Sequence, residues 1–168
     1  MNTLIEAMIG ELQREQDATR RVLERVPEDK LTWRPHAKSM TLGQLALHVA
    51  TIPANLSHMA ALDSFDAANA NFESPQPASK AEILTALDGA VTSGTEYLRS
   101  LTPTSAAAPW RLTLHGNDVF AMPRATMLRG FLFNHWYHHR GQLSVYLRLL
   151  DVPVPVIYGR SADENPFG

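Results

Sequence analysis

Apolar residues recur at spacings of three and four along four segments of the chain, a pattern typical of amphipathic helices with one buried face. The helices are predicted at residues 2–26, 41–62, 79–101 and 124–150. The second and third begin at capping-box sequences, in which Thr or Ser is followed three residues later by Gln or Glu. The polar, turn-rich crossover segment, residues 63–77, would join them. The pattern therefore predicts an all-α protein, a four-helix bundle with one long crossover.

Interruptions of this pattern carry further predictions. Glu15 breaks the apolar stripe of the first helix, so the middle of that helix is expected to face something polar. Pro53 lies inside the second helix and should kink it, because proline removes one backbone donor. Residues 110–114 alternate like a short strand within the otherwise irregular segment 102–123. The proline-rich tail at 152–159 is expected to pack along the surface without forming a helix.

Composition narrows the classes of protein that remain. The chain has 168 residues, 45% of them hydrophobic and 19% charged, which favours one globular domain over residues 1–168. The net charge is −2 and the charges are dispersed, so no nucleic-acid partner is expected. No run approaches the roughly 20 apolar residues that span a bilayer, and the early charged residues do not fit a signal peptide. We therefore expect a cytoplasmic protein with no membrane partner.

Two histidines, His135 and His139, carry the candidate chemistry. They are four residues apart in the last predicted helix, so both imidazoles can reach one ion from the same helical face. The predicted buried stripe of that helix is Leu128, Leu132, His135, His139, Leu143, Tyr146 and Leu150. A buried polar group without a partner costs about 1–3 kcal/mol, and a metal ion would be such a partner. Hydrogen bonds to backbone, or between the two histidines, would satisfy them equally well.

His48 is the best candidate for a third ligand. It lies about one turn after the cap of the second helix, beside the buried stripe, and helix bundles build metal sites from facing helices. Three histidines with no fourth protein ligand leave a tetrahedral position open, as in catalytic zinc sites. Imidazole ligands also suit nickel, copper and iron, so the residues alone do not identify the ion.

Several metal chemistries are excluded by residues that the chain lacks. A His-Glu-x-x-His protease needs Glu after its first ligand, where this chain has Trp136. A ferritin-like di-iron site needs glutamates, and no acidic residue lies between Arg124 and Leu150. A zinc deaminase needs cysteines, and the chain has none. That absence also excludes disulfides, thiolate ligands and cysteine nucleophiles.

The other polar candidates are given mostly structural roles. His138 is expected at the surface or at a subunit interface, and His58 is expected to be structural or exposed. Arg140 would be a solvated surface charge or an anchor for a substrate carboxylate or phosphate. His36 and His115 lie in loops that could approach the site. Tyr146 is expected to be a core or interface aromatic, near enough in helical phase to line a cavity, and Asp163 and Glu164 are expected to be solvated tail charges.

Two segments resemble the DinB-like superfamily. One is Thr41-Leu42-Gly43-Gln44-Leu45-Ala46-Leu47-His48, and the other is His135-Trp136-Tyr137-His138-His139-Arg140-Gly141-Gln142-Leu143. Residues 146–150 and the Pro153-Val154-Pro155 sequence before Tyr158-Gly159 continue the resemblance over nearly the whole chain. It implies an up-down-down-up bundle, usually a homodimer, in which His48, His135 and His139 hold one divalent ion. Zinc or nickel is expected first, with iron or manganese as alternatives.

The resemblance also implies a chemistry. Characterised relatives include bacillithiol S-transferases and mycothiol-dependent maleylpyruvate isomerase, which act with a thiol cofactor. The expected function is a metal-dependent S-transferase that activates a low-molecular-weight thiol for attack on a small electrophile. The sulfur must come from the cofactor, because the chain has no cysteine. The alternatives are a non-catalytic metal-binding stress-response protein and a metal-dependent hydrolase using the same site. No residue of the sequence identifies a general base, so no catalytic residue is assigned.

Overall fold

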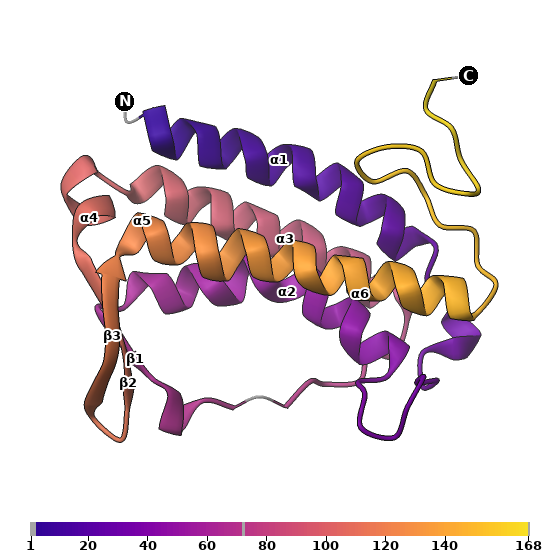
Figure 1. The fold of residues 1–168 in the computed structure, drawn as a ribbon, viewed down its shortest axis with the longest axis horizontal. Helices are drawn as coiled ribbons and strands as arrows, with labels where there is room; N and C mark the ends of the chain where they lie inside the picture. Colours follow the sequence, from indigo (N-terminus) through magenta and orange to yellow (C-terminus); the bar gives the residue numbers. More distant parts are fainter. Residues whose placement is uncertain (1–2, 72, 168) are drawn as a thin grey trace.

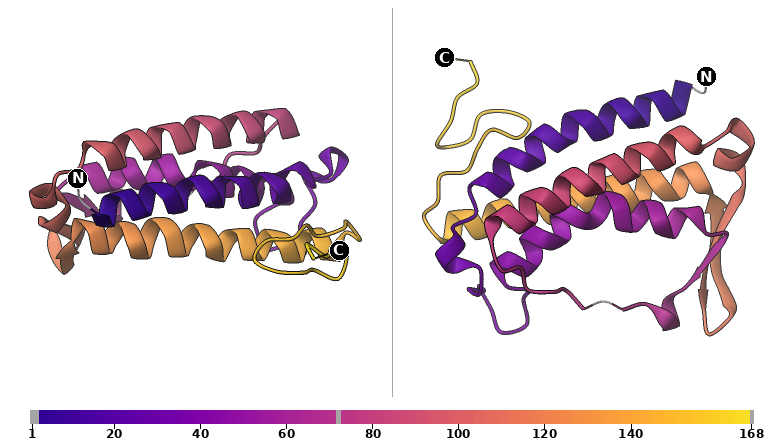
Figure 2. Two further views of the ribbon diagram at one scale, coloured as in Figure 1. Left: turned by 90° about the horizontal axis from the view of Figure 1, so that it is seen from above. Right: turned by 180° about the vertical axis from the view of Figure 1, so that it is seen from behind.

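Four long helices lie side by side in the computed structural model, which describes residues 3–71 and 73–167 (Figure 1). They are α1 (Thr3–Glu24), α2 (Leu42–Ala61), α3 (Lys80–Ser100) and α6 (His135–Leu149). Helices α2 and α3 run in one direction, and α1 and α6 run in the other (Figures 1 and 2). All four predicted helices are present. No described helix is long and apolar enough to cross a membrane.

The helix starts follow the predicted caps. At α2 the Thr41 hydroxyl accepts the Gln44 backbone N–H at 3.1 Å, and the Gln44 side-chain oxygen accepts the Thr41 N–H at 2.9 Å. This is a complete capping box. At α3 the Ser79 hydroxyl accepts from Glu82 N–H, but the Glu82 carboxylate accepts from the backbone N–H of Ala78 instead. The second predicted box is therefore only half formed.

The helical bundle is as predicted, and a small three-stranded sheet at one end of it was not predicted. Strand β1 (Ser64–Asp66) pairs in parallel with β2 (Pro109–Leu114), and β2 pairs antiparallel with β3 (Asn117–Pro123). The alternating segment correctly predicted β2, but the sequence predicted neither of its partners. Between β2 and β3, His115 and Gly116 have positive φ values of 51° and 77°, as tight hairpin turns require.

Arg124 stabilises the junction between the sheet and the end of α2, and Asp66 stabilises the hairpin turn. Arg124 is buried and donates to the carbonyl oxygens of Ala60 and Leu62, which would otherwise be unsatisfied at the C-terminus of α2. It also pairs with Asp63 at 2.9 Å. The Asp66 carboxylate accepts the backbone N–H groups of the hairpin turn at 3.0 and 2.8 Å. The first residues of the crossover segment, Asp63 and Asp66, are therefore held in place.

The remaining elements are short. They are the 3-10 turns η1 (Glu28–Lys30) and η2 (Ala67–Asn69) and the helices α4 (Pro103–Ala107) and α5 (Arg124–Met127). Helix α4 lies in the segment predicted to be irregular, where the Thr102 hydroxyl caps it by accepting from Ser105 N–H. Between α5 and α6 the chain forms a π-helix, η3 (Leu128–Asn134).

The π-helix displaces the predicted buried stripe of the last helix. A π-helical turn, with i→i+5 hydrogen bonds, contains more residues than an α-helical turn. Leu128 and Leu132 are buried as predicted, but the next fully buried positions are Phe133, Trp136 and Arg140. The stripe then continues through Leu143 and Leu147. His135 and His139 consequently lie at the border of the core, half-buried, instead of at its centre.

Arg140 is a correction to the predicted surface charge or substrate anchor. Its side chain is 2% exposed and pairs with the Glu15 carboxylate of α1 at 2.7 Å. It also donates to the Thr19 hydroxyl at 3.1 Å and to Tyr158 OH. The polar interruption predicted in α1 thus faces a buried guanidinium, which is already paired inside the protein.

The tail packs on the bundle without forming a helix, as predicted. Its acidic residues lie at the surface, as expected for tail charges, and each of them has a basic partner. Asp163 pairs with Arg148 of α6, and Glu164 pairs with Arg25, just after the end of α1. Asp163 also accepts the backbone N–H of Val154 at 2.8 Å, so the tail folds back on itself.

Candidate metal centre

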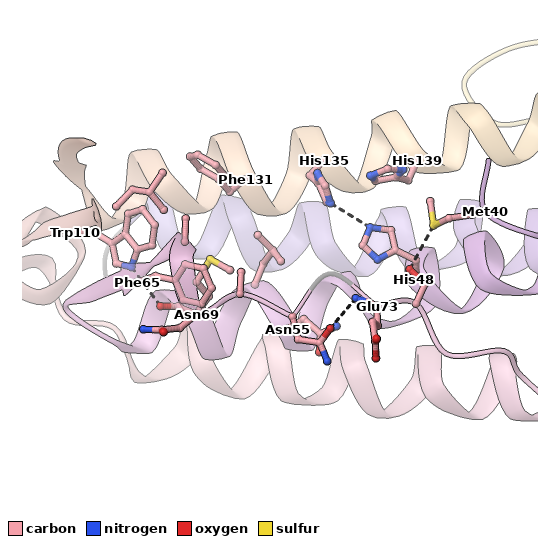
Figure 3. A pocket seen from close by; sticks show the side chains of 17 residues that line it. Met40, His48, Asn55, Phe65, Asn69, Glu73, Trp110, Phe131, His135 and His139 are labelled. Carbon is pink, nitrogen blue, oxygen red and sulfur yellow. Dashed lines mark hydrogen bonds between the residues drawn. The ribbon is translucent and has the colours of Figure 1, made fainter. Parts of the chain in front are cut away.

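Helices α2 and α6 bring His48, His135 and His139 together (Figure 3). One nitrogen from each ring lies within 4.8 Å of one nitrogen from each of the others. The Nε2 atoms of His48 and His135 are 3.2 Å apart. Two nitrogens bound tetrahedrally to one zinc ion at 2.0–2.1 Å would be about 3.3 Å apart. The spacing of this pair is therefore that of two ligands of one ion.

Burial keeps these imidazoles neutral, the form that binds metal. Burial, together with the neighbouring His139 and His135, lowers the pKa of His48 to about 4. Burial also lowers the pKa of His135 to about 4, again with a contribution from His139. The pKa of His139 is lowered mainly by burial, although its hydrogen bond to Gln142 acts in the opposite direction. All three nitrogen donors are thus available near neutral pH.

A hydrogen bond between α2 and α6 fixes the facing positions of the first two histidines. Pro53 has no N–H, so it cannot donate to the carbonyl of Val49 four residues earlier. The indole N–H of Trp136 donates to that carbonyl at 2.8 Å. Val49 follows His48 and Trp136 follows His135, so this bond fixes the registration of the two histidines. Pro53 thus leaves the Val49 carbonyl without a backbone donor, and Trp136 supplies the missing hydrogen bond.

Gly94 of α3 lies against the same part of α2. A Cβ on Gly94 would stand 3.2 Å from the Pro53 carbonyl oxygen, so the absence of a side chain lets α3 approach α2 closely. A Cβ on Gly89, the other glycine of α3, would meet only open space.

Gln142 orients the third histidine. Its side-chain oxygen lies 2.7 Å from His139 Nδ1, one turn further along α6. Because an amide oxygen only accepts, Nδ1 carries the proton and Nε2 is left unprotonated and able to accept a hydrogen bond or bind a cation. Outer partners of this kind fix the tautomer and ring orientation of metal-binding histidines.

The other histidines stay outside the cluster. His138 is exposed, and its ring centroid is 4.9 Å from that of His139. His58 lies 3.3 Å from the Ser93 hydroxyl, and His36 accepts from the Lys38 backbone N–H. His115 lies in the β-hairpin turn. Within residues 3–71 and 73–167, His48, His135 and His139 form the one group of three or more metal-ligating side chains close enough to share an ion.

The three histidines lie in the wall of a cavity of about 840 Å³. Helix α2 contributes His48, Asn55 and Met59 to the wall. The crossover segment contributes Asn69 and Glu73, which Figure 3 labels, and also Asn71. The sequence did not identify the crossover residues as part of a site, because a polar loop carries no periodic signal that places it in space.

Tyr146 packs against the hydrophobic core, as expected for a core aromatic, and is not among the residues that line this cavity. Its ring packs edge-on against Trp33 with the centroids 5.8 Å apart, and its hydroxyl points to the Met40 carbonyl at 3.4 Å. Met40 itself lines the cavity, so Tyr146 supports the wall from behind.

Comparisons with known proteins agree with this fold. The sequence model of the DinB family matches residues 1–165. The uncharacterized protein YrdA of Bacillus subtilis is 28% identical over 150 residues, which cover 89% of this chain and 85% of YrdA. A crystallised DinB-like protein of Bacillus cereus superposes with a TM-score of 0.69 at 23% identity, covering 91% of this chain and 97% of that one. YjoA, a DinB-like protein of B. subtilis, gives 0.67 at 17% identity, with 95% and 100% covered.

Proposed function

The chain belongs to the DinB family, and from that premise we propose that it binds one divalent metal ion through His48, His135 and His139. The observation that carries the proposal is the convergence of three neutral imidazoles from two helices at the wall of a cavity. Zinc or nickel suits three nitrogen donors best, and iron or manganese is the alternative. The proposed ion has a coordination position left for a ligand from the cavity.

Hydrogen bonds among the three histidines would explain their arrangement less completely than a bound metal ion does. His48 and His135 are close enough to share one proton, so that pair alone needs no ion. His139 is different, because Gln142 already accepts its Nδ1 proton while Nε2 remains an unprotonated acceptor near the other two rings. A cation satisfies all three acceptors at once, which supports metal binding over a cluster of core histidines.

We further propose that the bound ion serves an S-transferase. A divalent ion supplies a positive charge that lowers the pKa of a coordinated thiol or water at neutral pH. The chain would hold the ligands neutral, orient them through Trp136 and Gln142, and cover the reactants with the crossover segment. Since the protein has no cysteine, a low-molecular-weight thiol would enter as a co-substrate and attack a small electrophile.

Hydrolysis is the second candidate, and Glu73 favours it. Its carboxylate lines the same cavity as the three histidines, and a carboxylate near a metal-bound water is suited to accept its proton. The two chemistries differ in what they require of Glu73. A hydrolase that uses Glu73 as base would lose about 100-fold or more in kcat in Glu73→Gln, whereas a transferase that relies on the ion to ionise its thiol would lose far less.

The metal assignment is tested by elemental analysis of the purified protein and its variants. The wild type should contain one equivalent of metal, and His135→Ala should contain none after dialysis. His138→Ala is the matched control, because this exposed neighbour should keep the full equivalent. Unchanged metal content in His135→Ala and in His48→Ala would show that the ligand assignment is wrong.

The thiol assignment needs a separate experiment. Protein loaded with cobalt should develop sulfur-to-metal charge-transfer absorption when bacillithiol, mycothiol or glutathione is added. The same titration of His135→Ala provides the control for binding elsewhere. If none of the three thiols changes the spectrum of metal-loaded wild type, the transferase proposal fails while the metal proposal stands.

A further inference from the structure

The cavity is much larger than a metal ion needs. Its volume of about 840 Å³ lies within the range of pockets that enclose whole small molecules, 300–1,000 Å³. The three histidines occupy one end of it, and aromatic side chains occupy the other (Figure 3). The residues that line the cavity therefore indicate the length, apolar character and charge of the molecule that it can bind.

The far end is a preorganised aromatic compartment, defined by Phe65, Trp110 and Phe131. The Trp110 and Phe131 ring centroids are 6.1 Å apart. The Trp110 indole N–H donates to the Met59 carbonyl at 3.2 Å, which fixes the ring. Phe120 of β3 stacks behind Phe131 at 6.0 Å. Rings held in this way present an apolar surface suited to another ring or to a branched hydrocarbon.

The separation of the two ends sets the length of the ligand. Both His48 and Met59 of α2 line the cavity, and 11 residues at 1.5 Å per residue separate them by about 16 Å. Along the other wall, Phe131 and His139 are eight residues apart, which corresponds to about 12 Å. A molecule that touches both ends must therefore be extended.

The polar part of the cavity wall contains a negative charge, which disfavours anionic groups beside it. Among the described lining residues, Glu73 is the one with a formal charge, and no lysine or arginine joins it. Its backbone N–H donates to the Asn71 side chain at 2.8 Å, and the neighbouring Ser74 carbonyl accepts from Gln44 of α2 at 2.8 Å. The carboxylate is thus carried on an anchored stretch of chain. An anionic group beside this carboxylate and away from the proposed ion would be repelled, because no cationic side chain among the described lining residues offsets the repulsion.

We propose that the cavity binds an elongated small molecule that has an aryl or branched hydrocarbon end and no acidic group beside Glu73. That end lies among Phe65, Trp110 and Phe131, and the reacting end lies beside the three histidines, with Glu73 disfavouring acids. The position of the reacting end rests on the proposed function, whereas the aromatic compartment and the charge preference do not.

A series of phenylalkyl hydroxamic acids tests the length and the compartment together. The hydroxamate chelates a metal ion, and the methylene spacer between it and the phenyl ring is varied from short to long. Affinity of metal-loaded protein, measured calorimetrically, should rise to an optimum spacer and then fall. Phe131→Leu should weaken the optimum probe about tenfold and leave the shortest probe unchanged. Leu114→Ala, which removes an exposed side chain of the hairpin, is the matched control.

The charge preference is tested with probes that carry a carboxylate, a carboxamide or an ammonium group beside the hydroxamate. The carboxylate probe should bind at least about tenfold more weakly than the carboxamide, and Glu73→Gln should abolish that difference. Glu96→Gln, an exposed glutamate of α3, should leave it intact. A carboxylate probe that binds wild type as tightly as the carboxamide would overturn the charge preference.

Matched phenylalkyl amides, which do not chelate, separate this inference from the metal proposal. If the amides bind with the same spacer and Phe131 dependence but the hydroxamate adds nothing, the cavity inference stands and the metal proposal fails. If the hydroxamates bind through the metal with no effect of spacer or of Phe131→Leu, the cavity inference fails and the metal proposal stands. Thermal unfolding of each variant excludes loss of fold as the cause.

Discussion

The three histidine residues have acid–base properties unlike those of free imidazole. A reference pKa of about 6.5 would place the loss of metal near pH 6. Burial and the neighbouring rings lower the pKa values of His48 and His135 to about 4, so protons compete for these nitrogens only in more acidic solution. Residues that are costly to protonate are well suited to hold a cation.

The same shifts predict a pH dependence of stability in the metal-free protein. Between pH 6.5 and about 4 the unfolded chain binds more protons at His48 and His135 than the folded chain does. The free energy of unfolding should therefore decrease as the pH falls through this window. Urea unfolding at about pH 7.5 and about pH 5 measures the difference. This difference in the free energy of unfolding should be smaller in His48→Asn than in wild type, and His138→Ala is the control that should keep it. An equally large difference in His48→Asn would contradict the prediction.

Gln142 gives a prediction for metal affinity. Replacing Gln142 with Leu removes the acceptor that orients His139, and affinity should fall about 10–100-fold without loss of stoichiometry at saturating metal. Competition with a chromophoric chelator measures the affinity. Ser144→Ala, on the same helix and outside the cluster, provides the comparison, and equal affinities in both variants would contradict the role of Gln142.

At the scale of elements, a proline in one helix is matched by a tryptophan in another. Trp136→Phe would leave the Val49 carbonyl buried without a donor, which costs about 1–3 kcal/mol. Adding Pro53→Ala restores a backbone donor to that carbonyl, so the second substitution should recover part of the loss. Urea unfolding of the four proteins in this double-mutant cycle gives the coupling energy. Strictly additive effects would show that Pro53 and Trp136 are independent.

The elements also show which parts of the fold the sequence could predict. The long helices and the α2 cap follow from local periodicity and from adjacent residues, and the structure has them. Strand β1 has three residues and pairs with a segment 47 residues later, so no local pattern indicates it. The π-helix is likewise set by packing against α2, and it moves His135 and His139 from the predicted core to the cavity wall. The histidines themselves were identifiable because their spacing is local, whereas Asn71 and Glu73 were not.

At the scale of the whole molecule, Arg140 connects α1, α6 and the tail. Its guanidinium pairs with Glu15 and contacts the Tyr158 ring, whose centroid is 5.1 Å from Cζ. Arg140→Met would leave the Glu15 carboxylate largely buried without a counter-charge, so the free energy of unfolding should fall by about 3–5 kcal/mol. Urea unfolding measures the loss, and Glu15→Gln added to Arg140→Met should recover part of it.

An exposed ion pair provides the control for that measurement. Arg148 pairs with Asp163 at the surface, where the side chain of Arg148 is 47% exposed. Arg148→Met should change the free energy of unfolding by no more than about 1 kcal/mol. A loss as small in Arg140→Met would contradict the structural role assigned to the buried pair.

The long interval between the first and second histidines has a consequence for the order in which the protein is made. His48 and His135 are 87 residues apart, so a chain growing on the ribosome carries one of the three histidines until residue 135 has been added. The full set then forms only when the last helix packs against the second, a late, long-range contact. Binding of the proposed ion would thus report that α2 and α6 have packed together, and the ion would stabilise that contact after it has formed.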